Sequence, residues 1–242
     1  MAVHVIVGKG PVGTTTAQLL AARGQEVRVI SRSGGRSTER LAHVAADASD
    51  PESLRGHAHG AAVIYNCLNP AYHRWTTDWP PMATAILDTA EQAGAVLVTM
   101  GNLYGYGPVD HPIREGDPLA ALGTKGRVRN EMWRQALARH EAGRIRIVEA
   151  RASDFFGPEV RQSHVGERVM PSLLAGKAVR VLGDPDAPHT WSFMPDVART
   201  LVRLGAEERA WGKAWHVPSP PPVSSASTPQ PFAGRPVNGR PG

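Results

Sequence analysis

Short apolar runs alternate along this chain with longer stretches whose apolar residues recur at helical spacing. Strands are predicted at residues 3–7, 26–30, 41–46, 61–66, 95–100 and 144–150. Helices are predicted at residues 14–24, 82–94 and 125–140, with a shorter one starting at residue 50. Strands that alternate with helices in this way predict an α/β fold with a mostly parallel sheet, covered by helices on both faces.

Capping residues, prolines and glycines indicate where the predicted helices begin and end. Asp50 is expected to cap a short helix with Pro51 at its first position, and Arg23-Gly24 closes the first helix with a basic last turn and a glycine. Thr124 is expected to cap the helix at 125–140. Asp196 is expected to cap a helix at 197–204.

The segment GKGPVG, residues 8–13, lies between the first strand and the first helix. This is the context that a dinucleotide-binding fingerprint requires. Gly8 would allow the tight turn, Gly10 the approach of a pyrophosphate, and Gly13 close packing of helix on strand. Pro11 and Val12 complete the predicted cofactor loop, at a helix N-terminus that favours phosphate. The alternative is a glycine-rich turn with no ligand.

The end of the second strand indicates which dinucleotide is bound. An NAD site usually carries an acid here, bonded to the ribose 2′-hydroxyl, but this chain has Ser31 and Arg32. A hydroxyl and a guanidinium suit a 2′-phosphate, so NADP is predicted in preference to NAD. The other interpretation is a solvated basic loop.

Two further loops leave the predicted carboxyl edge of the sheet, where ligands bind in open α/β folds. Cys67, Leu68 and Asn69 follow the fourth strand and are predicted to contact the cofactor. Cys67 is interpreted as a small packing residue, because no partner base for a nucleophile is apparent. After the fifth strand, residues 101–108 form a glycine-rich loop that holds Tyr104 and Tyr106, a candidate reaction site.

Composition excludes several other classes of protein. The 242 residues carry a formal charge of +5, but the arginines are scattered, so no nucleic-acid patch is indicated. The chain has no stretch of about eighteen apolar residues and no secretory leader, which predicts a cytoplasmic protein without a membrane span. Cys67 is the single cysteine, so neither an intrachain disulfide nor a zinc motif is expected.

Several stretches together resemble the atypical or extended short-chain dehydrogenase/reductase superfamily, the NAD-dependent epimerase/dehydratase-like proteins. They are VIVGKGPVG, AADASDPESL, GNLYGYGP, TKGRVRNEMW, EARASDFFGPEV and the segment from residue 169 to residue 202. The resemblance implies a Rossmann-like doubly wound parallel sheet, a nicotinamide cofactor and a small-molecule substrate. It places Asp47 near the adenine and puts Phe155, Phe156, His189 and Trp191 at the substrate cleft.

The chain departs from this family where proton transfer is usually encoded. Counting along the family motifs puts Met100 where a serine or threonine usually stands, Gly123 where the tyrosine stands and Arg127 where the lysine stands. Thr99 is adjacent to the first position, and Lys125 lies on another helix face. Tyr104 or Tyr106 is therefore a candidate substitute proton donor, supported by Thr99 and Arg127. The alternative is that both tyrosines only pack against the ligand.

The expected organisation is a dinucleotide-binding domain at 1–156, a small substrate lobe at 157–217 that looks truncated, and a disordered Pro/Ser/Gly-rich tail at 218–242. An NADP-preferring oxidoreductase or epimerase-like enzyme is the first functional hypothesis. A redox-silent NADP-binding sensor is the second, and a degraded family member is the third. The sequence does not indicate the oligomeric state.

Overall fold

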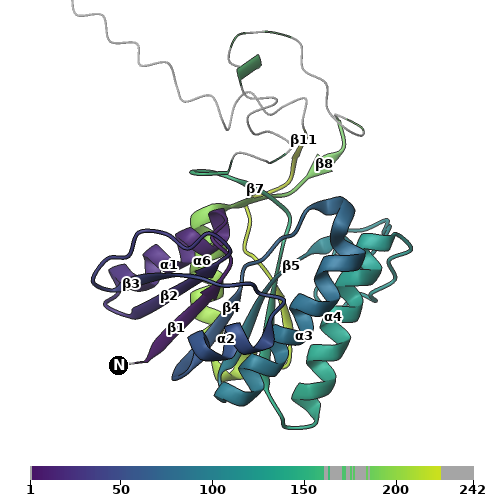
Figure 1. Ribbon diagram of the computed structural model, residues 1–242. Coiled ribbons are helices and arrows are strands. Elements are labelled where there is room, and N and C mark those ends of the chain that lie inside the picture. Colours follow the sequence, from purple (N-terminus) through teal and green to yellow (C-terminus); the bar gives the residue numbers. More distant parts are fainter. Residues whose placement is uncertain are drawn as a thin grey trace, which may run out of the picture.

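A computed structural model of the chain describes residues 2–160 and 186–224, together with residues 163, 171, 172, 175, 177 and 184. Its centre is a seven-stranded parallel sheet with the order β10-β6-β5-β4-β1-β2-β3 (Figure 1). The strands are β1 Val3–Val7, β2 Glu26–Ser31, β3 Leu41–Ala45, β4 Ala61–Asn66, β5 Val96–Asn102, β6 Arg146–Ala152 and β10 Ala214–His216. This confirms the predicted Rossmann-like sheet.

Helices cover both faces of the sheet. Helices α1 Pro11–Ala22 and α6 Met194–Ala206 pack together on one face. Helices α2 Pro51–Ala58, α3 Trp75–Ala93 and α4 Thr124–Glu141 lie side by side on the other (Figure 1). The strand order reverses between β1 and β4, and the loops beyond that point are the expected ligand site of such a sheet.

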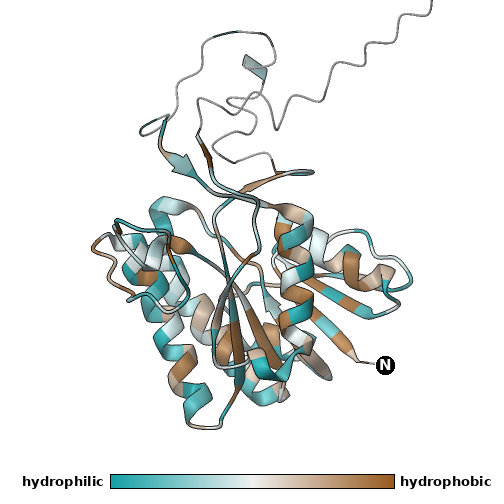
Figure 2. Cartoon of the chain, turned by 180° about the vertical axis from the view of Figure 1, so that it is seen from behind, coloured by the Kyte–Doolittle hydropathy of each residue, from teal (hydrophilic) through white to brown (hydrophobic). Residues whose placement is uncertain are grey.

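Successive side chains along each strand point alternately into two separate hydrophobic cores, one on each face of the sheet. In β1, Ile6 belongs to the core beneath α1 and α6, whereas Val5 and Val7 belong to the core beneath α2 and α3. Adjacent strand residues point to opposite faces, so a strand buried on both sides must be apolar throughout. Figure 2 shows these strands as brown ribbons between helices that carry much of the hydrophilic surface.

Helix α3 begins at Trp75, seven residues before the predicted start at Met82. Pro80 and Pro81 therefore lie inside the helix, although proline lacks the N–H group that an interior helical position donates. Trp75 and Trp79 are almost completely buried. Burial of two such large side chains outweighs the loss of hydrogen bonds at the prolines.

Two predicted caps are wrong. Gly123 is the N-cap of α4, and Thr124 is already the first helical residue. Phe193 is the N-cap of α6, and the Asp196 side chain instead accepts hydrogen bonds from Arg199 within the helix. Asp50 does cap α2, since its carboxylate accepts a hydrogen bond from the Glu52 N–H group at 3.0 Å.

Two small sheets lie beyond the carboxyl edge of the large one (Figure 1). Strand β7, Asp154–Phe156, pairs in parallel with β9, Trp191–Phe193, and β8, Pro188–His189, pairs antiparallel with β11, Val223–Ser224. Three 3-10 helices complete the described elements: η1 Tyr72–Arg74, η2 Leu103–Gly105 and η3 Glu208–Ala210. Because β11 lies beyond residue 217, the described fold extends into the stretch expected as a tail. Residues 225–242 and most of 161–185 lie outside the described residues.

Candidate cofactor and reaction site

The three loop glycines differ in what surrounds them. Gly8 has a positive φ of +114°, and a side chain there would come within 2.7 Å of the Cys67 carbonyl oxygen. A side chain at Gly13 would collide with the carbonyl oxygen of Gly8. At Gly10, by contrast, a side chain would meet no atom within 4 Å. Two glycines are therefore needed to close the turn, and the third leaves the backbone open on its outer side.

The open side of the loop coincides with the N-terminus of α1. Gly10 is the N-cap in an extended conformation, Pro11 is at the start of the helix, and no side chain caps the first turn. The first N–H groups of a helix have no partner within the helix, and the helix dipole is positive at that end. Val12 and Gly13 are buried beneath this turn. The geometry and charge fit a phosphate group.

The loop after β2 is attached to the glycine loop by a lysine. The Lys9 ammonium donates to the Ser33 hydroxyl at 3.1 Å and also to the Gly34 carbonyl oxygen. The hydroxyl of Ser31 donates to the same carbonyl oxygen at 3.3 Å. Arg32 is exposed between these residues. Lys9 was not among the predicted site residues, although a cation inside the glycine loop was the available signal in the sequence.

Asp47 is exposed and accepts hydrogen bonds from the backbone N–H group and the hydroxyl of Ser49, at 2.9 and 2.8 Å. These bonds, and more weakly the nearby Arg32 guanidinium, lower the pKa of Asp47. An ionised carboxylate therefore stands beside the cationic loop after β2.

The loop after β4 forms the opposite wall of the glycine turn. Cys67 is buried, its N–H group donates to the Val7 carbonyl oxygen at 2.9 Å, and burial raises the pKa of its thiol to about 12. A protonated, buried thiol is a packing group, as interpreted from the sequence. Leu68 is partly buried, and its N–H group donates to Asn66 at 3.3 Å, while Asn69 is exposed.

Thr99 belongs to a row of polar residues across three neighbouring strands. Asn66 in β4 pairs with Thr99 in β5, which pairs with Glu149 in β6. All three line a small cleft beneath α3 and α4, together with Trp133. Thr99 is thus placed beneath the helices, next to a buried carboxylate.

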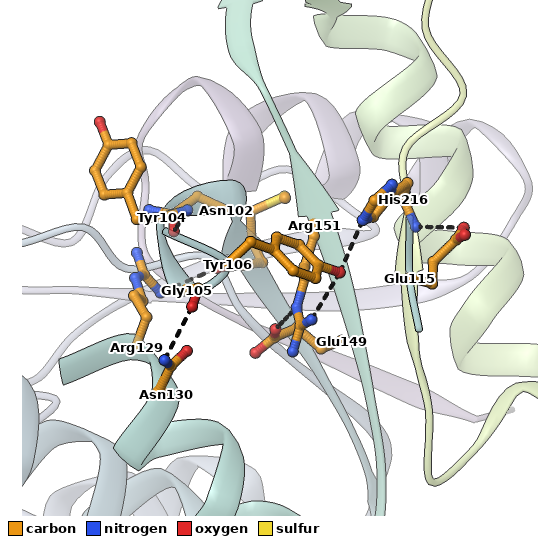
Figure 3. A network of polar contacts seen from close by, with 11 residues as sticks. Asn102, Tyr104, Gly105, Tyr106, Glu115, Arg129, Asn130, Glu149, Arg151 and His216 are labelled. Carbon is orange, nitrogen blue, oxygen red and sulfur yellow. Dashed lines mark hydrogen bonds and ion pairs between the residues drawn. The ribbon is translucent and has the colours of Figure 1, made fainter. Parts of the chain in front are cut away.

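The two candidate tyrosines point in opposite directions (Figure 3). Tyr106 is only 1% exposed, and its hydroxyl accepts a hydrogen bond from Arg151 at 2.8 Å. The same hydroxyl is 2.8 Å from the ring Nε2 of His216, and the backbone N–H group of His216 donates to the Glu115 carboxylate at 3.2 Å. Arg151 and His216 thus surround the Tyr106 hydroxyl. These contacts argue against the predicted proton donation to a substrate and give Tyr106 a structural role.

Tyr104 is 40% exposed and lies at the carboxyl edge of β5. Its hydroxyl is 3.3 Å from the hydroxyl of Tyr72, which follows β4 and is 47% exposed. Partial burial and the hydrogen bond with Tyr72 raise the pKa of the Tyr104 phenol, so it is protonated at neutral pH. Tyr72 was missed in the sequence because no motif marks it. Only the pairing of β4 with β5 brings the two phenols together.

Gly123 and Arg127, the positions where counting along the sequence motif predicts a tyrosine and a lysine, lie at the start of α4. Gly123 offers no proton-transfer group there. The Arg127 side chain is exposed and donates to the Leu122 carbonyl oxygen, and to the Thr124 hydroxyl at 3.5 Å. Lys125 reaches a different place, with its ammonium 4.3 Å from the ring centre of Tyr72. The guanidinium of Arg127 is therefore hydrogen-bonded to residues at the start of α4.

The four residues expected at the substrate cleft come together in the small sheets. His189 Nε2 is 2.8 Å from the Asp154 carboxylate, and its ring lies 4.7 Å from that of Trp191. The rings of Phe156 and Phe193 contact each other in a tilted arrangement, with their centres 5.1 Å apart. Phe155 packs partly on the core, and Trp191 is 5% exposed. Trp191 is therefore the most buried of the four, whereas His189, Phe155 and Phe156 are partly exposed.

Within the described part of the chain, no three His, Cys, Asp or Glu side chains are grouped as metal ligands. In the same residues, no helix is long and apolar enough to span a bilayer.

Comparison with known protein families assigns this chain to one of them. The model of the NAD dependent epimerase/dehydratase family matches residues 4–217. The chain belongs to this family. A comparison with curated proteins finds no match. The family assignment agrees with the glycine loop, the parallel sheet and the strand order described above.

Solved structures share the fold at low sequence identity. An epimerase from the methanogen Methanothermobacter thermautotrophicus has a TM-score of 0.82 and 20% identity, covering 93% of this chain and 74% of that one. MoeE5 in complex with UDP-glucuronic acid and NAD has a TM-score of 0.80 and 21% identity, covering 93% and 79%. DesIV, a dTDP-glucose 4,6-dehydratase from Streptomyces venezuelae solved with NAD, has a TM-score of 0.79 and 19% identity, covering 93% and 78%.

Proposed function

We propose that this family member binds a nicotinamide dinucleotide, NADP in preference to NAD, and acts as an oxidoreductase or epimerase-like enzyme on a small molecule. The observation that carries the proposal is the open backbone at Gly10, beside a helix N-terminus that no side chain caps. Structural neighbours solved with NAD bound support the same class of cofactor.

The preference for NADP rests on two cations. Arg32 follows β2 directly, and the Lys9 ammonium is held against Ser33, one residue further along. A 2′-phosphate placed at this loop would gain charge-assisted hydrogen bonds from both. No carboxylate occupies position 31 or 32, where one would bind the 2′-hydroxyl of NAD.

The remaining cofactor contacts follow from the strand order. The pyrophosphate would lie on Gly10, Pro11 and the first turn of α1, with Gly8, Val12 and Gly13 shaping the turn. The adenosine would lie between Ser31 and Asp47, and the rest of the molecule would run past the loop formed by Cys67, Leu68 and Asn69. The bound nicotinamide supplies hydride chemistry. Tyr104 is the proposed proton donor to the substrate oxygen.

The substrate would bind between Tyr104 and the small sheets. Asp154 contributes to the raised pKa of Tyr104, so its carboxylate lies close enough to act on that phenol. His189, hydrogen-bonded to Asp154, supplies a further polar group, and Phe156 an apolar one. MoeE5 was solved with UDP-glucuronic acid or UDP-glucose, so nucleotide sugars belong in any substrate panel. A cytoplasmic location remains a prediction.

A second candidate function is a redox-silent NADP sensor. Met100, Gly123 and Arg127 stand where the family motifs place a hydroxyl residue, the tyrosine and the lysine. A chain without these groups can retain cofactor binding and lack turnover. The cofactor contacts are common to both functions, so binding and turnover must be measured separately.

Cofactor binding is tested by titrating the purified chain with NADPH and with NADH, following cofactor fluorescence. Arg32→Ala should weaken NADPH binding about tenfold to a hundredfold, since it removes a charge-assisted hydrogen bond, and leave NADH binding unchanged. Arg40→Ala is a matched control at the opposite, amino edge of the sheet, where Arg40 bonds to Gly24. Binding of neither cofactor would refute the proposal. Tighter binding of NADH would refute only the NADP preference.

Turnover is tested by following NADPH oxidation with a panel of carbonyl compounds that includes 4-keto nucleotide sugars. Oxidation that depends on the carbonyl compound supports an enzyme. Tight cofactor binding with neither oxidation of NADPH nor epimerisation or dehydration of a nucleotide sugar in the panel favours the sensor.

A further inference from the structure

A column of two cations and three aromatic rings runs from the carboxyl edge of the sheet into the protein. The Lys125 ammonium lies 4.3 Å from the ring centre of Tyr72, and Tyr72 stacks on Trp75 at 4.9 Å with an interplanar angle of 14°. The Arg129 guanidinium lies 4.7 Å from the ring centre of Trp75 and 4.4 Å from that of Trp79. The buried end of the column fixes the position of Tyr72 at its exposed end.

Helical spacing explains how the column is built. Lys125 and Arg129 are four residues apart in α4 and therefore share a face. Trp75 and Trp79 are likewise four apart in α3, with Tyr72 in the preceding turn η1. Packing of α3 against α4 interleaves the two sets. A cation over a ring face is attracted to it, and more strongly where water is excluded.

The outer ring of this column meets Tyr104. The two hydroxyl oxygens are 3.3 Å apart, and both phenols are partly exposed at the edge where β4 and β5 end. Burial and Tyr72 raise the pKa of Tyr104, so Tyr104 retains its proton more firmly than a free phenol. The Lys125 ammonium over the Tyr72 ring places a positive charge beside this pair of phenols.

We propose that Tyr72 and Lys125 are positioning residues that complete the proton-transfer site of Tyr104, in place of the tyrosine and lysine missing at positions 123 and 127. This inference rests on the proposed function. When a carbonyl group is reduced, its carbon gains a hydride from the reduced nicotinamide and its oxygen gains the Tyr104 proton. Tyr104 then takes the Tyr72 proton, the charge rests on Tyr72 beside Lys125, and a solvent proton restores Tyr72.

The arrangement is tested first in the free protein, without cofactor or substrate. The chain has four tyrosines, and replacing them by 3-fluorotyrosine lowers the pKa of each phenol and makes its ionisation visible by ¹⁹F NMR. Each ¹⁹F resonance is assigned by the corresponding Tyr→Phe variant. The Tyr104 resonance should titrate at lower pH in Tyr72→Phe, because Tyr72 raises the pKa of Tyr104.

Lys125→Met removes the positive charge and should move the first ionisation of the pair to higher pH, by about half a unit or more. The matched control is Lys213→Met. Lys213 also lies over a ring, 6.0 Å from the centre of Trp215, but at the amino end of β10. The control should leave both titrations unchanged. If Tyr72→Phe and Lys125→Met also leave them unchanged, the inference is overturned.

Kinetics separate this inference from the proposed function. With a carbonyl compound that is turned over, Tyr72→Phe should lower kcat at least tenfold, leave KM within about twofold, and shift the pH profile of kcat. Unchanged kcat and pH profile in a variant that binds NADPH normally would overturn the inference alone. Failure of the wild type to bind either cofactor would overturn the proposed function, while the coupled phenol titrations would stand. Cofactor binding without turnover of any carbonyl compound would contradict the proton-transfer role.

Discussion

Glu149 and Arg151 form an ion pair inside the protein, with Arg151 Nε 2.6 Å from Glu149 Oε1. They are two residues apart in β6, so both side chains point to the face that α4 covers. The side chains are 9% and 5% exposed. Burial raises the pKa of the Glu149 carboxyl, and the arginine opposes that rise. The pair joins the polar row of Asn66 and Thr99 to the hydroxyl of Tyr106.

Breaking this pair should be costly. Arg151→Met leaves a buried carboxylate without its partner and should lower the free energy of unfolding by about 3–5 kcal/mol, measured by urea denaturation. Arg134→Met is the control, since Arg134 pairs with Glu131 at an exposed position and its loss should cost less than about 1 kcal/mol. Equal losses in the two variants would show that the buried pair adds nothing.

Tyr104 and Tyr106 should respond in opposite ways to loss of the hydroxyl. Tyr106→Phe removes the oxygen that Arg151 and His216 share and should cost about 1–3 kcal/mol of stability. Tyr104→Phe should change stability by about 0.5 kcal/mol or less, and abolish turnover of any carbonyl substrate. Thermal denaturation and NADPH oxidation measured on both variants test this assignment. A stable Tyr106→Phe variant without turnover would restore Tyr106 as a candidate proton donor.

His216 should make stability depend on pH. Burial lowers the pKa of His216 below its ordinary value of 6.5, while Glu115 and Asp117 oppose the shift and Arg151 adds to it. Between the lowered value and 6.5 the unfolded chain binds more protons than the folded one, so stability is lost as pH falls below about 6.5. Urea denaturation at pH 7.5 and 5.5 should show this loss.

The variant His216→Gln should reduce the pH dependence. His59→Gln, at an exposed residue that ends α2, is the control and should leave the loss between pH 7.5 and 5.5 as in the wild type. If His216→Gln leaves the loss of stability between pH 7.5 and 5.5 unaltered, another titratable group governs stability in this pH range.

Two glycine variants should separate folding from cofactor binding. Gly13→Ala places a methyl group against the Gly8 carbonyl oxygen and should cost about 1–3 kcal/mol of stability. Gly10→Ala meets open space at an ordinary φ of −74°, so its stability should stay within about 0.5 kcal/mol of the wild type. Its NADPH affinity should nevertheless fall at least tenfold, because the methyl group lies on the side left open for the pyrophosphate. Normal affinity of Gly10→Ala would show that the pyrophosphate does not lie there.

Local sequence determined most of the Rossmann-like sheet, because strand and helix periodicities, the glycine loop and the Asp50 cap are each encoded within a few residues. The family was predicted from such segments, and the family match confirms it. The early start of α3 was not predictable in this way, because Trp75 and Trp79 compensate for Pro80 and Pro81 only once they are buried.

What the tertiary structure alone decided is how side chains that are distant in sequence combine. The sequence offered Tyr104 and Tyr106 as equivalent, and only packing buried one against His216, 110 residues away, and left the other exposed beside Tyr72. The sequence placed Lys125 on a different helix face from Arg127. It reaches Tyr72 because α3 and α4 lie against the same face of the sheet. Hydrogen bonds and cation–ring contacts depend on distances between strands and helices, and these are set by the whole fold.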